Sequence, residues 1–235
     1  MSGGIALVYM GDASPENSEC PQAAREALEG RFEVVYVGDA CELDVPTALR
    51  MLNPVLYVQP GGGDDMGVAW AAVGPNKEAL REWVGNGGKY LGICMGSFLS
   101  GQGGDDDDFE GYELITEAGW DTSDYIETPG ADIIDMNQTL VTVDWEGTFT
   151  QIFFQGGPSF VPLEEGVEPS GEVVARYSNG DAAAIVVPFG AGMVAVTGPH
   201  PEAVESWYDD VANEGGPRGA VVHDLLHQLI DKLYE

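Results

Sequence analysis

Basic residues are scarce in this sequence of 235 residues. Nine lysines and arginines stand against forty aspartates and glutamates, which gives a formal net charge of −31. Such a chain repels phosphate groups, so we expect neither nucleic acid nor an anionic membrane surface as a partner. The acidic residues are spread along the whole chain. We interpret this composition as adaptation to a salt-rich cytoplasm, as in halophilic archaea; an ordinary acidic protein is the alternative.

Long apolar runs are also missing. No run approaches the ~20 residues that a helix needs to cross a bilayer. The first ten residues, MSGGIALVYM, lack the basic segment and the longer apolar run of a signal peptide. We expect them to hold a first core strand, and we expect a cytoplasmic protein. The length is within the range of one α/β domain, which we predict to span residues 1–235.

Cysteine occurs three times, at Cys20, Cys41 and Cys94. The spacing fits neither a zinc site nor the disulfide framework of a small secreted protein. We therefore expect reduced thiols and no metal or other cofactor. A reduced thiol in a suitable setting can act as a nucleophile.

The sequence itself alternates between short apolar runs and helical patterns. In the first half, residues 20–29 and 76–84 have the pattern of helices, and the expected strands are 5–9, 32–37, 54–58 and 89–93. This alternation predicts a mostly parallel central sheet with helices on both faces, a flavodoxin-like three-layer α/β sandwich.

The second half has the pattern of hairpins. Strand-like segments are 139–145, 148–154, 172–177, 182–187 and 193–197, and turn signals such as Glu146-Gly147 and Phe189-Gly190 separate them. Residues 102–130 have weak periodicity, and we interpret 101–108 as a loop. Residues 221–234 close the chain as an amphipathic helix. We therefore expect an added antiparallel portion beside the parallel sheet.

The segment Gly92-Ile-Cys94-Met-Gly96 has the G-x-C-x-G pattern of a nucleophile elbow, between an expected strand and a short helix. Glycines on both sides leave room for the neighbouring backbones, and a helix N-terminus favours a thiolate. Cys20 and Cys41 lack such a setting in the sequence, so we predict Cys94 as the reactive thiol. The alternative is a small buried cysteine at a tight crossover.

The segment Thr197-Gly-Pro-His200-Pro-Glu202 follows another apolar strand. A cysteine nucleophile needs a base, and the base needs an acceptor that orients it. His200 and Glu202 are two residues apart, so on an extended segment both side chains can point to one side. Glu202 can then bind one ring nitrogen while the other faces Cys94. Alone, the segment also fits a loop with a solvated histidine.

The segment Gln59-Pro-Gly61-Gly62-Gly63 ends the expected strand 54–58. Ligands of open α/β sheets bind at such carboxyl ends. The backbone N–H groups of a glycine-rich turn can form an oxyanion hole with the N–H of Met95. A phosphate cradle is a weaker interpretation, because no Gly-Lys-Ser/Thr follows and Asp64-Asp65 would repel phosphate. A third interpretation is a wide turn that binds no ligand.

These three motifs, in this order, resemble the class I glutamine amidotransferase-like superfamily. More narrowly, the chain is similar to stand-alone proteins related to the N-terminal domain of biotin-protein ligases, and the similarity covers nearly its whole length. The turn 11–15 and the segment 156–158 support it. The resemblance implies Cys94 as nucleophile, His200 as base and Glu202 as its orienting group. It also implies the N–H groups of Gly62 and Met95 as oxyanion donors.

One position departs from that pattern. Glutamine-hydrolysing members usually have glutamine four residues after the cysteine, and here this position is Phe98. We therefore expect a substrate-binding surface near Phe98 that does not suit free glutamine. Two hypotheses follow. One is a cysteine amidohydrolase or amidotransferase that acts on a small-molecule amide or serves a partner synthase. The other is a non-catalytic binding or regulatory module that retains the pocket.

Two further features have simpler interpretations. The run 105–108 consists of aspartates, but it lacks the spacing of a calcium loop, so we interpret it as a solvated acidic loop. His223 and His227 are four residues apart on the last helix without a third ligand nearby. We interpret them as a helix-surface pair rather than as metal ligands.

Overall fold

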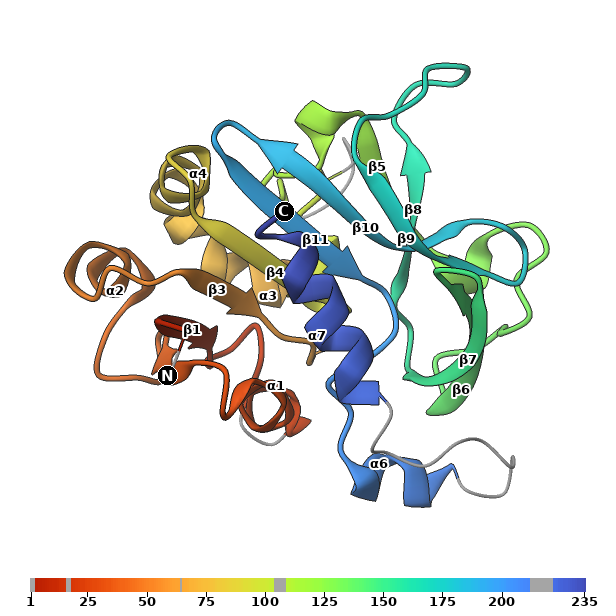
Figure 1. The fold of residues 1–235 in the computed structure, drawn as a ribbon, viewed down its shortest axis with the longest axis horizontal. Helices are drawn as coiled ribbons and strands as arrows, with labels where there is room; N and C mark the ends of the chain where they lie inside the picture. Colours follow the sequence, from red (N-terminus) through yellow and green to blue (C-terminus); the bar gives the residue numbers. More distant parts are fainter. Residues whose placement is uncertain (1–2, 16–17, 64, 104–108, 212–221) are drawn as a thin grey trace.

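The computed structural model describes residues 3–15, 18–63, 65–103, 109–211 and 222–235. Its centre is a mixed sheet with the strand order β2-β1-β3-β4-β11-β10-β9-β6-β7 (Figure 1). The parallel part consists of β1 (Ile5–Tyr9), β2 (Glu33–Val37), β3 (Leu56–Gln59), β4 (Lys89–Ile93) and β11 (Gly192–Thr197). The predicted parallel core is confirmed.

Antiparallel strands extend this core on one side. They are β10 (Ala182–Phe189), β9 (Glu172–Tyr177), β6 (Thr139–Trp145) and β7 (Thr148–Phe154). Two strands were not expected, β5 (Trp120–Asp124) and β8 (Pro158–Pro162), which pair with each other. β5 lies in the stretch of weak periodicity, and prolines at both ends of β8 hide its strand character. The predicted antiparallel portion is thus confirmed and is larger than expected.

Helices cover both faces of the parallel strands. Ala6 and Val8 of β1 belong to one hydrophobic core, together with α1 (Cys20–Leu28) and α7 (Val222–Lys232). Leu7 and Tyr9 belong to a second core, which contains side chains of α2 (Val45–Met51), α3 (Met66–Val73) and α4 (Lys77–Gly85). Because successive side chains of a strand point to opposite faces, one strand contributes to both cores. The predicted three-layer arrangement is confirmed.

The sequence interpretation missed the short helix α6 (Glu205–Asp210), and it also missed α2 and α3. The α3 segment, MGVAWAAV, is apolar all round and therefore has no amphipathic periodicity to detect. Both α2 and α3 begin at an aspartate cap: the Asp44 side chain accepts a hydrogen bond from the Thr47 N–H, and the Asp65 side chain accepts one from the Val68 N–H. No helix within the described residues is both long enough and apolar enough to span a bilayer.

Three neighbouring parallel strands deliver the three motifs to one edge of the sheet. Gln59 of β3 is opposite Gly92 of β4, and Thr197 of β11 is opposite Ile93. The segments 60–63, 94–98 and 198–202 follow these strand ends directly. Since β3, β4 and β11 run in the same direction, segments distant in the sequence meet where ligands of α/β sheets bind.

Candidate active site

Cys94 occupies a sharp turn between β4 and α5 (Met95–Phe98). Its backbone has φ 51° and ψ −109°, a conformation that is rare for a residue other than glycine. Its N–H donates a hydrogen bond to the carbonyl oxygen of Thr197 at 2.9 Å, which ties the turn to β11. The strained strand-to-helix turn has the geometry of a nucleophile elbow, as the G-x-C-x-G pattern predicted.

The residues around the elbow explain why the turn can form. A Cβ on Gly96 would overlap the carbonyl oxygen of Gln59, so the helix can approach β3 this closely only with glycine there. Ser97 is buried, and its Oγ lies 2.9 Å from the Gly92 carbonyl oxygen and 2.8 Å from that of Thr197. The sequence interpretation had no signal for Ser97, because its partners are backbone groups of two different strands.

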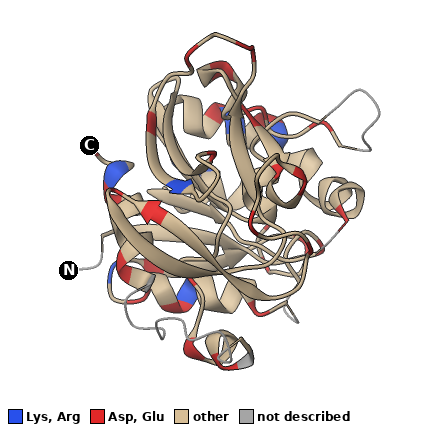
Figure 2. Cartoon of the chain, turned by 90° about the vertical axis from the view of Figure 1, so that its right-hand side faces the viewer, with Lys and Arg blue, Asp and Glu red and all other residues tan. Residues whose placement is uncertain are grey.

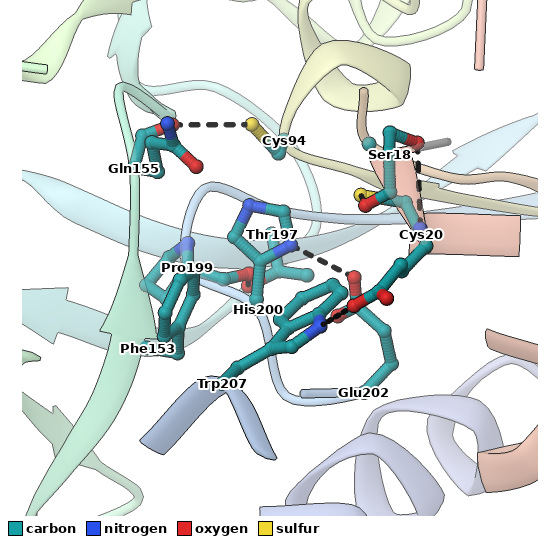
Figure 3. Close-up of polar contacts among 12 residues, drawn as sticks. Ser18, Cys20, Cys94, Phe153, Gln155, Thr197, Pro199, His200, Glu202 and Trp207 are labelled. Carbon is teal, nitrogen blue, oxygen red and sulfur yellow. Dashed lines mark hydrogen bonds and ion pairs between the residues drawn. The ribbon is translucent and has the colours of Figure 1, made fainter. Parts of the chain in front are cut away.

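His200 and Glu202 are in direct contact. His200 Nδ1 lies 2.8 Å from Glu202 Oε1, and both side chains are buried (Figure 3). The imidazole packs against the rings of Phe153 and Trp207, with centroid distances of 5.8 and 5.7 Å. Because Glu202 engages Nδ1, the other ring nitrogen, Nε2, is left for Cys94. The histidine is therefore held in a defined orientation, and the loop interpretation with a solvated histidine is wrong.

The pKa of His200 reflects three opposing influences. Burial lowers it, whereas the negative charge of Glu202 and the interaction with Cys94 raise it, and the net pKa lies well above the ordinary value of 6.5. Glu202 Oε2 is buried without a hydrogen-bond partner among the described residues, so the charge of this carboxylate acts mainly on His200. An imidazolium is therefore stable at neutral pH in this pocket.

A cleft of about 360 Å³ opens above Cys94. The thiol donates to the backbone carbonyl oxygen of Gln155 at 3.7 Å. The residues that line the cleft are Ser18, Cys20, Gly62, Gly63, Cys94, Met136, Gln138, Gln155 and His200. The structure thus brings Cys94, His200 and the glycine-rich turn to one solvent-accessible space of a size suited to a small ligand.

Three further predicted site residues, Gly61, Met95 and Phe98, are not among the residues that line the cleft. A Cβ at Gly61 would lie 2.8 Å from His200 Cε1 and 3.3 Å from Cys94 Cβ. The Met95 side chain is buried in the core, and its amide is the first of α5, which has no partner within the helix. Phe98 is half-buried and does not line the cleft, so its contact with a substrate stays a prediction.

A comparison with protein families identifies the chain. The sequence pattern of the family described as "Biotin-protein ligase, N terminal" matches residues 5–105 and 117–230. The chain belongs to this family. No curated protein sequence matches it.

Solved structures share the fold of this family member at low sequence identity. A glutamine amidotransferase from Thermotoga maritima has a TM-score of 0.61 and 13% identity, with 100% of both chains covered. A glutamine amidotransferase from Methylobacillus flagellatus has a TM-score of 0.56 and 13% identity, over 100% of this chain and 93% of that one. A cytoplasmic protein from Salmonella typhimurium has a TM-score of 0.56 and 12% identity, over 97% and 98%. At these identities the similarity shows the fold alone.

The structure corrects the expectation for Cys20. The sequence interpretation held that Cys20 lacks a setting like that of Cys94, yet Cys20 begins α1 and lines the same cleft. The segment before α1 reaches the site because the buried Ser14 side chain donates a hydrogen bond to the Gly61 carbonyl oxygen. Burial raises the pKa of Cys20 to about 12, although the charge of His200 opposes this. Cys20 is therefore a protonated thiol at neutral pH.

The other sequence candidates lie outside the cleft. His223 Nε2 lies 3.1 Å from the backbone oxygen of Glu202, and His227 Nε2 lies 2.7 Å from that of Ala27. Both histidines thus attach α7 to neighbouring segments, so the interpretation of a mere surface pair is incomplete. The run 105–108 lies outside the described residues. Within the described ranges, no cluster of three His, Cys, Asp or Glu side chains is arranged to hold a metal ion.

Proposed function

We propose that this chain is a cysteine-dependent amidohydrolase or amidotransferase that acts through a thioester intermediate. The observation that carries the proposal is the placement of His200, which contacts Glu202 through Nδ1 and shares the cleft with Cys94. A nucleophile on a strained elbow, a base beside it and a carboxylate that orients the base are the elements of nucleophilic acyl transfer.

The reaction follows from these positions. Cys94 reacts as the thiolate, with its proton held on His200, and the sulfur attacks the carbonyl carbon of the amide. The N–H groups of Gly62 and Met95 stabilise the oxyanion that forms. His200 then donates the proton to the leaving nitrogen, the C–N bond breaks and ammonia or an amine departs. Water, activated by His200, attacks the thioester and releases the acid and the free thiol.

The substrate we propose is an amide other than free glutamine. Within the part of the chain that the structure describes, the residues that line the cleft include no lysine or arginine to pair with an α-carboxylate. Phe98 stands where glutamine-hydrolysing members usually have glutamine, and it brings no hydrogen-bonding group to that position. The amide is either a small molecule or one presented by a partner synthase that receives the ammonia. We place this activity in the cytoplasm.

The decisive experiment combines ammonia release with detection of the acyl-enzyme. A panel of primary amides is incubated in high salt with the unmodified chain, Cys94→Ser and His200→Gln. We expect ammonia release and an acylated Cys94 peptide with the unmodified chain alone. Release that persists in Cys94→Ser contradicts the mechanism. Failure of every amide to acylate Cys94 favours the binding module.

A further inference from the structure

A smaller hollow of about 190 Å³ adjoins the cleft. It shares five lining residues with the cleft, so the two hollows are adjacent: Ser18, Cys20, Gln138, Gln155 and His200. The smaller hollow adds Glu19, Phe153 and Trp207. A substrate whose amide lies at Cys94 would therefore extend toward one carboxylate and two aromatic rings.

These three side chains form a connected group. Trp207 Nε1 donates a hydrogen bond to Glu19 Oε2 at 3.1 Å. The Phe153 ring lies beside the indole, with a centroid distance of 5.1 Å. The hydrogen bond holds the Glu19 carboxylate against the indole, so the charge has a fixed position at the end of the hollow. Within the described residues, no hydrogen bond or ion pair engages Oε1 of Glu19.

Negative charge is in excess among the described residues that line the two hollows. Among these described residues, neither lining includes a lysine or an arginine. Glu202 offsets the charge of a protonated His200, because the two are in contact. Glu19 forms no ion pair within the described part of the chain. A cation is the ligand group that suits a carboxylate next to an indole, since the face of an aromatic ring also attracts positive charge.

We propose that the substrate is a cationic amide, whose ammonium or guanidinium group lies against Glu19 and Trp207 while its carbonyl carbon lies at Cys94. This inference rests on the proposed function for the reacting end of the substrate. The net charge of −31 also draws cations toward the chain, but it does not direct them to this hollow.

The charge preference can be measured at Cys94 without turnover. Three methanethiosulfonates of similar size serve as probes: the cationic aminoethyl, the neutral methyl and the anionic sulfonatoethyl reagent. In each case the Cys94 thiolate attacks the sulfenyl sulfur, a mixed disulfide forms and methanesulfinate leaves. Peptide mass spectrometry at one fixed salt concentration gives the rates at Cys94. The ratio of the cationic to the anionic rate cancels changes in the nucleophilicity of the thiol.

Glu19→Gln should lower this ratio at least about threefold, as expected for the loss of one partly exposed charge contact. The matched control is Glu26→Gln, which removes the same charge from an exposed position of α1, the helix that directly follows Glu19, outside both hollows. It should leave the ratio unchanged. Trp207→Leu should lower the ratio, and Trp207→Phe, which keeps a ring, should retain most of it. Equal ratios in Glu19→Gln and Glu26→Gln would overturn the inference.

Three small amides extend the test to turnover: β-alaninamide is cationic, butanamide neutral and succinamate anionic. We expect ammonia release to be fastest with β-alaninamide, and Glu19→Gln should remove that advantage. Equal rates with all three amides contradict the cationic substrate. No release from any of them, together with an intact charge ratio at Cys94, contradicts hydrolysis and supports the cation-binding hollow. The two proposals therefore fail in different measurements.

Discussion

His200 Nδ1 lies 2.8 Å from Glu202 Oε1 in a site where the glutamate side chain is fully buried. Removing a carboxylate from water is costly unless a positive charge or hydrogen bonds compensate it. The contact with a protonated His200 supplies that compensation, and burial ensures that the surrounding salt screens it little. The pair therefore couples the stability of the fold to the protonation of one histidine.

The first prediction concerns pH. The folded state raises the pKa of His200 above its ordinary value, so it binds this proton more tightly than the unfolded chain does. The stabilisation is complete below pH ~6.5 and is lost as the pH rises through the raised pKa. Urea unfolding at constant salt should show a declining free energy of unfolding from pH 6.5 to 9, and His200→Gln should flatten the decline. The same slope in both proteins would contradict the assignment.

The second prediction concerns thiol reactivity. Brief, substoichiometric iodoacetamide at neutral pH should modify Cys94 before Cys20 and Cys41. Burial raises the pKa of both other thiols, to about 12 for Cys20, so their thiolate fractions are small. His200→Gln should slow Cys94 alkylation at least about tenfold, because the neighbouring positive charge is lost. Peptide mass spectrometry measures this, and preferential labelling of Cys20 would count against the elbow.

The third prediction concerns the glycine of the elbow. Gly96→Ala should lower the free energy of unfolding by about 1–3 kcal/mol or more, because the new methyl group would overlap the Gln59 carbonyl oxygen. The control is Gly85→Ala near the end of α4, where the new methyl group would lie 3.7 Å from Phe189 Cε1, an ordinary van der Waals distance. It should leave stability unchanged or raise it slightly. Urea unfolding compares the two variants, and a neutral Gly96→Ala would show that the elbow tolerates a side chain.

The fourth prediction concerns salt. Acidic residues greatly outnumber basic ones along the chain (Figure 2). Among the described residues, ion pairs engage Arg25, Arg31, Lys77, Arg81 and Lys232. Few cations therefore remain to offset the other carboxylates. Since repulsion reaches ~30 Å at 0.01 M salt and ~3 Å at 1 M, the melting temperature should rise at least about 5 °C across that KCl range. A flat or falling melting temperature would remove the argument for adaptation to salt.

The fifth prediction concerns glutamine. The isolated chain should not release ammonia from free L-glutamine at a useful rate, because none of the described residues that line the cleft is a lysine or arginine that could pair with its carboxylate. Each hydrogen bond lost by a buried charged group costs roughly 1–3 kcal/mol. An ammonia assay in high salt, with Cys94→Ser as the control, provides the measurement. Robust release that depends on Cys94 would make the chain an ordinary glutaminase.

Much of the fold was predictable because its strands are short apolar runs with clear turns between them. β1, β4, β6, β7 and β9 have the predicted bounds. The misses have specific causes: α3 is apolar on all sides, and β5 pairs with β8, which also pairs with β10. Pairing between distant segments leaves no periodic signal in either of them, so residue patterns alone could not reveal it.

The sequence by itself determined the elbow, the His200–Glu202 pairing and their common edge of the sheet, because each depends on local backbone geometry or on strand direction. Only the tertiary structure decided what surrounds them. Cys20 reaches the site because the loop before α1 folds onto the glycine-rich turn, and Trp207 reaches it through its hydrogen bond to Glu19. Such contacts join segments up to 188 residues apart. Their energy depends on side-chain packing in three dimensions, which no pattern of neighbouring residues encodes.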